Sequence, residues 1–148
     1  MRIAKVMTQN IHSIESTAGI AEAARMMGEF DIGVLPVMDD GELVGIVTDR
    51  DLAVRGLAEG LHSGSPVMRV MTADVRTCRE DDDLDDALEA MAREQVRRLP
   101  VCSDAGELVG IVSIGDLAKK DDDEEEVTEA LRDICRPAGL HSQRLQAA

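Results

Sequence analysis

The sequence predicts an α/β fold, of the α+β type, built from two similar units. The thirteen residues GELVGIVTDRDLA, which begin at Gly41, recur almost unchanged as GELVGIVSIGDLA at Gly106. Around each copy the hydrophobic pattern has the same order: a short extended segment, an amphipathic helix, two apolar strands and a second short helix. Each β-α-β-β-α unit is close to the size, about 60 residues, at which a domain alone buries little surface. We therefore expect the two units to pack on each other.

The boundaries of the repeat follow from its offset. Val70 lies 64 positions after Val6, and from Gly41 onward the offset is 65, so one residue is added in the turn between the two strands. Hairpin turns tolerate such insertions. The segment GLAEGLHSGSPVM is rich in Gly and Ser and predicts a linker. The expected organisation is a first repeat at residues 1–60, a linker at 61–68, a second repeat at 69–120, and an acidic C-terminal helix and tail at 121–148.

The helix of each copy is predicted from apolar residues at i, i+3, i+4 and i+7, the spacing of one helix face. Ser16 or Thr17 can cap the first of these helices, and one of the three acids at 81–83 can cap the second. The apolar stripes are Ile20, Ala23, Ala24 and Met27 in the first copy and Leu84, Ala87, Leu88 and Met91 in the second.

The strands and the remaining helices follow in order. VLPVM with LVGIVT, and RLPVC with LVGIVS, each predict two strands joined by an Asp/Gly turn. DRDLAVRG and IGDLAKK each predict a second short helix. After the second repeat, a run of acids leads into another helical stripe, and Pro137 lies beyond its end. That stripe consists of Val127, Ala130, Leu131 and Ile134.

The composition argues against several classes of function. The net charge of −14 repels nucleic-acid backbones and anionic membranes, so we expect neither as a partner. No apolar run approaches the roughly 18–20 residues that span a bilayer, and the N-terminus lacks the apolar stretch of a signal peptide, so we expect a cytoplasmic protein. The three cysteines lack metal-ligand spacing, and no Ser/His/Asp or Cys/His arrangement is suggested. We therefore expect free thiols, no metal site and no catalytic residue.

The doubled motif offers two chemical roles at the start of a helix. An Asp follows Thr48 by three residues, and another follows Ser113 by three. Such a carboxylate can accept hydrogen bonds from both hydroxyls of a ribose, while the hydroxyl and the free helix N–H groups face a phosphate. The same spacing is also a capping box, which satisfies only the helix's own backbone. Gly45 and Gly110, three residues earlier, suit a strand that a backbone or a ligand approaches closely.

These motifs resemble the CBS domain, named after cystathionine β-synthase. VLPV with GIVTDRD, and RLPV with GIVSIGD, match the family's strand and G-h-V-[ST]-x-x-D motif in the correct order, over roughly residues 4–120. The resemblance implies a stand-alone tandem CBS protein, or Bateman module, with repeats related by pseudo-twofold symmetry and often a homodimer. It also implies a regulatory protein without an obligatory cofactor, whose ligand is an adenine nucleotide or adenosyl compound such as AMP, ADP, ATP or S-adenosylmethionine.

The resemblance implies two ligand clefts, each drawing residues from both repeats. We favour the first cleft, because Gly33 leaves room for an adenine and Arg98 stands where the family often has a phosphate-binding basic residue. In the second, Arg97 crowds the ring and Val34 replaces that basic residue, with Arg50 as a substitute. The favoured cleft comprises Ile11, Ile32, Gly33, Arg98, Ser113 and Asp116, and the second comprises Val34, Thr48, Arg50, Asp51, Val75, Val96 and Arg97.

Three functions follow from this interpretation, in decreasing order of support. The first is an adenine-nucleotide sensor that changes the angle between its repeats and signals to a regulated protein partner. The second is a constitutive dimeric interaction or stress-response module with non-functional clefts, suggested by the amphipathic helix at 127–135. The third is an enzyme acting on a nucleotide, for which the sequence supplies no nucleophile, metal cluster or positioned base.

Overall fold

The computed structural model describes residues 1–119 and 124–135, which divide into two compact units. The first-repeat unit comprises Ile11–Val75. The second-repeat unit comprises Met1–Asn10 together with the chain from Arg76 onward. The tail predicted after the C-terminal helix lies outside the described residues.

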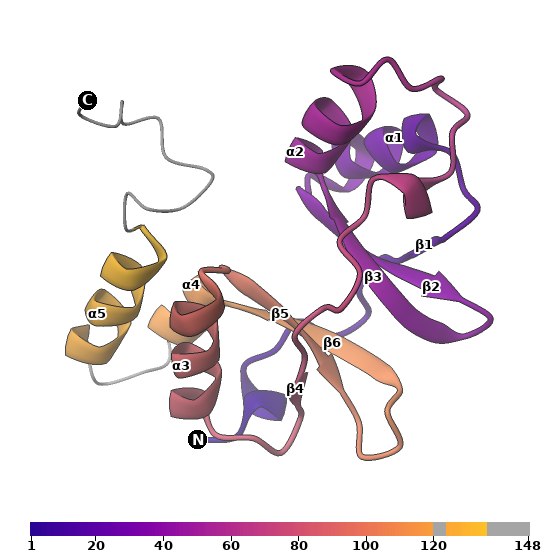
Figure 1. Ribbon diagram of the computed structural model, residues 1–148. Coiled ribbons are helices and arrows are strands. Elements are labelled where there is room, and N and C mark those ends of the chain that lie inside the picture. The colour runs from indigo at the N-terminus through magenta and orange to yellow at the C-terminus, as the bar shows by residue number, and fades with distance from the viewer. Residues whose placement is uncertain (120–123, 136–148) are drawn as a thin grey trace, which may run out of the picture. The chain divides into compact units, whose positions relative to one another are not determined.

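The first-repeat unit has the predicted β-α-β-β-α order (Figure 1). Its sheet has the strand order β1-β2-β3, with β1 parallel to β2 and β2 antiparallel to β3. After β3 a short helical turn, α2, continues as the π-helix η2. The elements are β1 (Ile14–Glu15), α1 (Ile20–Phe30), β2 (Val34–Asp39), β3 (Glu42–Thr48), α2 (Asp49–Asp51), η2 (Leu52–Leu57) and η3 (Val67–Arg69).

The second-repeat unit repeats this topology, with the strand order β4-β5-β6 and the same strand directions. The mixed α/β class with two three-stranded sheets is therefore confirmed. A further helix, α5, follows the repeat and confirms the predicted C-terminal helix. The elements are η1 (Ile3–Lys5), β4 (Cys78–Arg79), α3 (Leu84–Glu94), β5 (Arg98–Cys102), β6 (Leu108–Ser113), α4 (Ile114–Ala118) and α5 (Glu124–Ile134).

Each VMT segment joins the sheet of the other repeat. The backbone of Thr8 exchanges hydrogen bonds of 2.8 and 3.0 Å with Ile111, and that of Thr72 exchanges bonds of 2.9 and 3.0 Å with Ile46. A Cβ atom at Gly110 would lie 2.8 Å from the Thr8 carbonyl oxygen, and one at Gly45 would lie 2.8 Å from that of Thr72. Both glycines are thus required by the close approach of another backbone, one of the two reasons expected for them.

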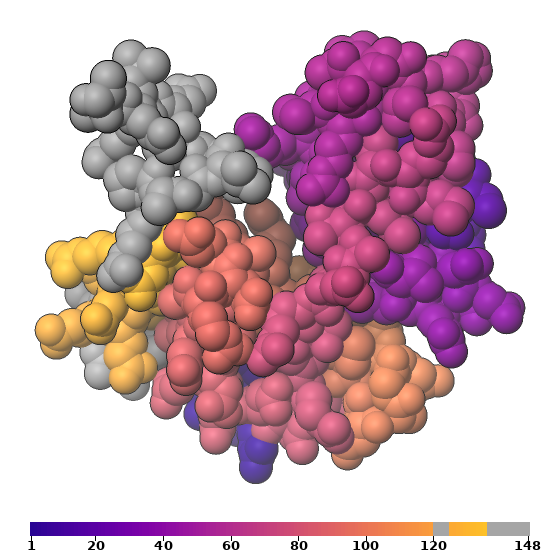
Figure 2. Space-filling view, in the orientation of Figure 1, coloured from indigo at the N-terminus to yellow at the C-terminus, as the bar shows by residue number. Residues whose placement is uncertain are grey.

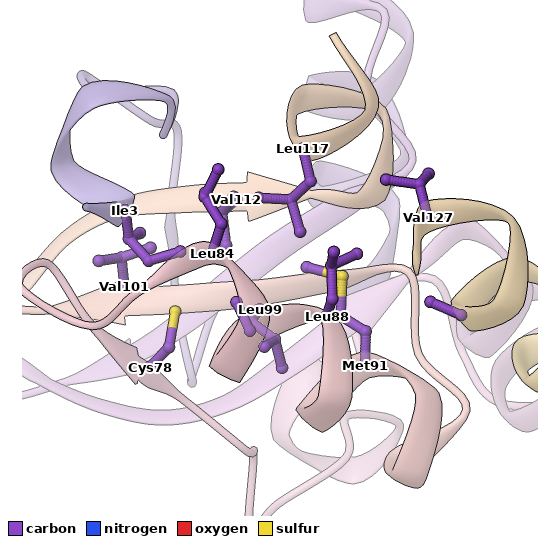
Figure 3. Packing of buried hydrophobic residues seen from close by; sticks show 12 residues of the cluster. Ile3, Cys78, Leu84, Leu88, Met91, Leu99, Val101, Val112, Leu117 and Val127 are labelled. Carbon is purple, nitrogen blue, oxygen red and sulfur yellow. The ribbon is translucent and has the colours of Figure 1, made fainter. Parts of the chain in front are cut away.

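The core of each unit is aliphatic and lies between the helices and the sheet. In the second-repeat unit Leu99, Val101 and Val112 of the sheet are at most 1% exposed and pack with α3, α4 and α5 (Figure 3). The first-repeat unit has a matching cluster around Leu35, Val37 and Val47. Burial of such side chains contributes about 1.5–3 kcal/mol each relative to exposure.

Neither α1 nor α3 has the predicted side-chain cap, although Asp83, one of the three acids proposed for α3, is its N-cap residue. Helix α1 begins after Gly19, so neither Ser16 nor Thr17 caps it; its first N–H groups, those of Ile20 and Ala21, donate to the carbonyls of Ser65 and Ser63. Helix α3 begins after an Asp at 83 that makes no side-chain bond to the helix backbone, and its first N–H donates to the carbonyl of residue 1. Backbone carbonyls from distant segments therefore satisfy these helix starts, a role that side chains often take.

Within the described part of the chain, none of the helices has the length and apolar character needed to cross a membrane.

Candidate functional site

The doubled motif forms a capping box in both units. The Thr48 N–H donates to Asp51 Oδ2 over 2.9 Å, and the Asp51 N–H donates back to Thr48 Oγ1 over 3.1 Å. In the second-repeat unit the Ser113 N–H and Oγ both lie in bonding range of Asp116 Oδ2, at 2.9 and 2.6 Å, and the Asp116 N–H donates to Ser113 Oγ. The capping role is confirmed, and it fixes each carboxylate at the start of its helix.

The two carboxylates differ in the surroundings of Oδ1, the oxygen that the capping box does not use. Asp51 Oδ1 lies 3.6 Å from Arg55 Nε, and the Asp51 side chain is only 14% exposed. No hydrogen bond or ion pair from the described residues reaches Asp116 Oδ1, and Asp116 is half-buried. The residue at the position of Arg55 in the second copy is Lys120, which lies outside the described residues. Of the two motif carboxylates, Asp116 is therefore the one whose second oxygen has no partner among the described residues.

Arg55 also connects the Asp51 motif to the second VMT segment, residues 70–72, which pairs with β3. Its Nη1 lies 3.3 Å from the carbonyl oxygen of Val70, 3.2 Å from that of Met71 and 3.3 Å from Thr72 Oγ1. Arg55 is not among the site residues predicted from the sequence. A signal was present, because Arg55 stands four residues after Asp51 on a helix, the spacing of a side-chain ion pair.

Three residues of the favoured set lie together in the second-repeat unit. Arg98, at the start of β5, is the register partner of Ser113 at the end of β6, and Asp116 follows in α4. Arg98 is exposed, and its strand β5 lies next to the strand that leads into the motif. A cation beside a hydroxyl and a helix N-terminus is a suitable environment for a phosphate.

The other three residues of that set, Ile11, Ile32 and Gly33, lie in the first-repeat unit, and each is half-buried. Asp49, which the sequence analysis did not include, crowds Gly33. Asp49 Oδ2 lies 3.1 Å from the position that a Cβ atom of Gly33 would take, and the Asp49 N–H donates to the Gly33 carbonyl over 3.1 Å. The space left by the missing side chain thus faces a carboxylate, and a base stacked there would have to displace the exposed Asp49 side chain.

The second predicted set is divided in the same way. Val34 is the register partner of Thr48, and the backbone N–H of Arg50 donates to Asp49 Oδ1 over 2.8 Å. Val75 is the last residue of the first-repeat unit, whereas Val96 and Arg97 are exposed residues of the second. The Arg97 carbonyl accepts from the Ile114 N–H over 2.9 Å, in correspondence with the Gly33–Asp49 bond. The members of this set in the first-repeat unit are Val34, Thr48, Arg50, Asp51 and Val75.

Cys78 and Cys102 lie in environments that disfavour the reactive thiolate form. Burial, with a smaller effect of Asp82, raises the pKa of Cys78 from 9.0 to about 12. Burial also raises the pKa of the half-buried Cys102. Both thiols are thus held protonated at neutral pH, which makes them poor nucleophiles and ligands. A search of residues 1–119 and 124–135 finds no group of three His, Cys, Asp or Glu side chains placed to hold a metal ion.

Comparison with known proteins agrees with the doubled topology. The family model described as "CBS domain" matches residues 3–56 and 67–123. The CBS domain-containing protein YhcV of Bacillus subtilis is 38% identical over 128 residues, which are 86% of this chain and 91% of that protein.

Two solved structures with adenosyl ligands are also similar. CBSX2 in complex with AMP is 29% identical, with a TM-score of 0.72 over 80% of this chain and 93% of that one. The CBS domain pair of protein MJ0100, in complex with 5′-methylthioadenosine and S-adenosyl-L-methionine, is also 29% identical, with a TM-score of 0.72 over 80% and 94% of the two chains. With two matched copies and the β-α-β-β-α order in each, the chain belongs to the CBS domain family as a tandem CBS protein.

Proposed function

We propose that this tandem CBS protein is a regulatory sensor that binds an adenine nucleotide or adenosyl compound through the Ser113–Asp116 motif. The observation that carries the proposal is the state of Asp116. Its Oδ2 is used by the capping box, and its Oδ1 has no partner among the described residues. A half-buried carboxylate with a free oxygen can accept hydrogen bonds from the hydroxyls of a ribose.

The remaining predicted contacts complete this proposal. Arg98, next to Ser113 across the β5–β6 pair, supplies a cation for the phosphate of AMP, ADP or ATP. Ile11, Ile32 and Gly33 supply the contacts to the base. That related CBS proteins are solved with AMP and with S-adenosyl-L-methionine supports this class of ligand.

The ranking of the two motifs is supported by Arg55. Its guanidinium lies against Asp51 Oδ1, the oxygen that the capping box does not use, so a ligand that binds this oxygen must compete with an existing ion pair. The Asp51 motif also has Val34 where the other has Arg98, and it relies on Arg50 for a phosphate contact. We therefore expect the Asp51 site to bind more weakly or to stay empty.

In this proposal the protein acts by binding rather than by catalysis. A ligand favours whichever arrangement of the repeats it binds more tightly, and a protein partner responds to the shift. We also propose that the chain acts as a homodimer. The alternative of a constitutive interaction module drew on the apolar stripe of the C-terminal helix, but Val127 and Ala130 of that stripe are 6% exposed and belong to the core of their own unit.

Calorimetry with AMP, ADP, ATP and S-adenosylmethionine tests the proposal. Asp116→Asn keeps an acceptor for the Ser113 N–H and loses the charge, so it should weaken binding by about 10- to 150-fold, the equivalent of about 1.5–3 kcal/mol for a hydrogen bond to a charged group. Asp51→Asn is the matched control and should change the affinity much less. Equal losses would show that the ranking of the motifs is wrong, and the absence of both heat and thermal shift with all four ligands would exclude this function.

A further inference from the structure

Helix α5 packs on the helix that carries the Ser113–Asp116 motif. Leu117, the residue after Asp116, is fully buried and shares one core cluster with Val127 and Ala130 of α5. Figure 3 shows Val127 at the edge of that cluster, and Figure 2 shows α5, in yellow, lying directly against α3. The motif and the contact with α5 thus lie on neighbouring residues of one short helix, α4.

Helix α4 depends on this packing for its position. It has only five residues, Ile114–Ala118, and a helix that short is not stable by itself. Two interactions hold it: the capping box at its start, and the burial of Leu117 in the cluster formed with α3 and α5. Loss of α5 would uncover Leu117 and weaken the second of these restraints on the motif.

The first repeat holds its motif in another way. After that motif the chain stays helical through α2 and η2, and Arg55 ties the motif to residues 70–72. Leu52, the counterpart of Leu117, is half-buried and lines an open groove of about 420 Å³ between α1 and η2. Within the described residues, a covering helix is therefore a support that only the second motif has.

A narrow stripe holds α5 on its unit. Val127 and Ala130 are buried and Ile134 is half-buried, whereas most of the other residues of this helix are exposed. The side-chain amide of Gln95 adds a hydrogen bond of 3.2 Å to the carbonyl of residue 133. An isolated helix of eleven residues is marginal in water, so α5 should be helical only while it is docked.

The charges along this contact also limit its strength. Acidic side chains from both helices line a groove between α3 and α5: Asp85, Glu89, Glu126, Glu129 and Asp133. Like charges gathered along one contact weaken it. A helix with few buried residues and an acidic contact belongs to the part of a unit that opens most readily.

We propose that α5 regulates the affinity of the Ser113–Asp116 motif for its ligand. Docked, α5 supports α4 and keeps Asp116 in the geometry of the capping box; undocked, it uncovers Leu117 and lets α4 shift. This inference rests on the proposed function and adds the element that controls the site. Because coupling is reciprocal, a ligand at Asp116 favours docked α5 by the same factor by which docking raises the ligand's affinity.

Hydrogen exchange and calorimetry of the full chain test this coupling with AMP, ADP, ATP and S-adenosylmethionine. At saturation, a compound that binds the wild type should slow exchange of the α5 amides by about 5- to 150-fold, the usual range of coupling between sites. Val127→Asp places a charge in the buried contact, so α5 should exchange fast and the affinity should fall by a similar factor. Leu131→Asp is the matched control, since Leu131 is 40% exposed on the same helix, and it should change neither quantity.

Glu129→Lys tests the coupling without disturbing the core. Glu129 is exposed in the acidic groove, so a cation there should strengthen docking and slow exchange of the α5 amides in the absence of ligand. Four results would overturn regulation by α5 alone: ligand binding that leaves α5 exchange unchanged, full affinity in Val127→Asp with α5 undocked, an equal loss in Leu131→Asp, or faster α5 exchange in Glu129→Lys. The absence of binding with all four compounds overturns the proposed function as well.

Discussion

Replacing Arg55 by methionine should destabilise the first-repeat unit by a modest amount. The change removes the ion pair with Asp51 and the contacts of Nη1 with the Val70 and Met71 carbonyls and with Thr72 Oγ1. An NH₂ group has two hydrogens, so at most two of these three contacts are complete hydrogen bonds at one time. The Arg55 side chain is 51% exposed, which places the ion pair in the weak class.

We expect the loss in the free energy of unfolding to be about 1–2 kcal/mol, from roughly two modest hydrogen bonds and a solvent-screened ion pair. For a chain of this length that corresponds to a fall in Tm of about 2–8 °C, measurable by calorimetric or circular-dichroism melting. Arg50→Met is the matched control, because the Arg50 side chain makes no hydrogen bond or ion pair within the described residues, and it should change stability by less than about 0.5 kcal/mol.

The two arginine variants should have opposite effects on ligand binding at Asp51. Without Arg55 the Asp51 Oδ1 is free, and a ribose no longer competes with the guanidinium. The affinity of this site should rise by about tenfold for each 1.4 kcal/mol of competition removed, seen as a second binding event in calorimetry. Arg50→Met should weaken that event, because Arg50 is the proposed phosphate contact there. Weaker binding in Arg55→Met, or an unchanged Tm, would refute the idea that Arg55 holds Asp51 and competes with the ligand.

Three further predictions concern stability. Gly110→Ala should lower the free energy of unfolding by about 1–3 kcal/mol, because its Cβ would lie 2.8 Å from the Thr8 carbonyl oxygen. Gly28→Ala is its control in the same denaturant titration: the new Cβ lies in open space, so the free energy of unfolding should rise by up to about 1 kcal/mol. Ser113→Ala should cost about 0.5–2 kcal/mol with no ligand present, and an unchanged melting curve would contradict the capping role. Because the folded pKa of Cys78 is raised from 9.0 to about 12, the unfolded thiol ionises first, and this residue should lower the free energy of unfolding above pH 9 by up to about 1.4 kcal/mol per pH unit. Cys78→Ala should reduce the slope to the smaller part that comes from Cys102, whereas Cys135→Ala, at an exposed position, should leave it unchanged.

The order of the elements and the capping motifs could be predicted because their signals are local. The apolar spacing of Ile20, Ala23 and Met27 predicts a helix face, and those three residues are buried in α1. The spacing of Ser113 and Asp116 predicts both a capping box and a ribose site, and the structure shows the first. Each of these patterns is contained within a few residues of the chain.

Contacts between distant segments leave no such pattern. The carbonyls of Ser63 and Ser65 satisfy the start of α1, a role that the sequence assigned to the side chain of Ser16 or Thr17. Every residue has the same backbone carbonyl, so no residue type in the sequence shows that a distant carbonyl will accept from the first N–H groups of a helix. The proximity of Asp49 to Gly33 was missed for a similar reason, since it depends on how β3 and the start of β2 are paired. Gly33 indicated only that a side chain is missing there, and that space was assigned to an adenine rather than to Asp49.

The two repeats have the same topology, and the residues that differ between them lead us to expect different binding properties. At the motif, Arg55 engages Asp51, whereas the free oxygen of Asp116 faces no described partner. At the helical face, α5 covers the second copy, whereas the groove and Leu57 remain exposed in the first. Since a carboxylate engaged by its own arginine binds ligand less readily, the two motifs should differ in their affinity for a ligand. The second repeat is therefore the one suited to contribute the stronger ribose site.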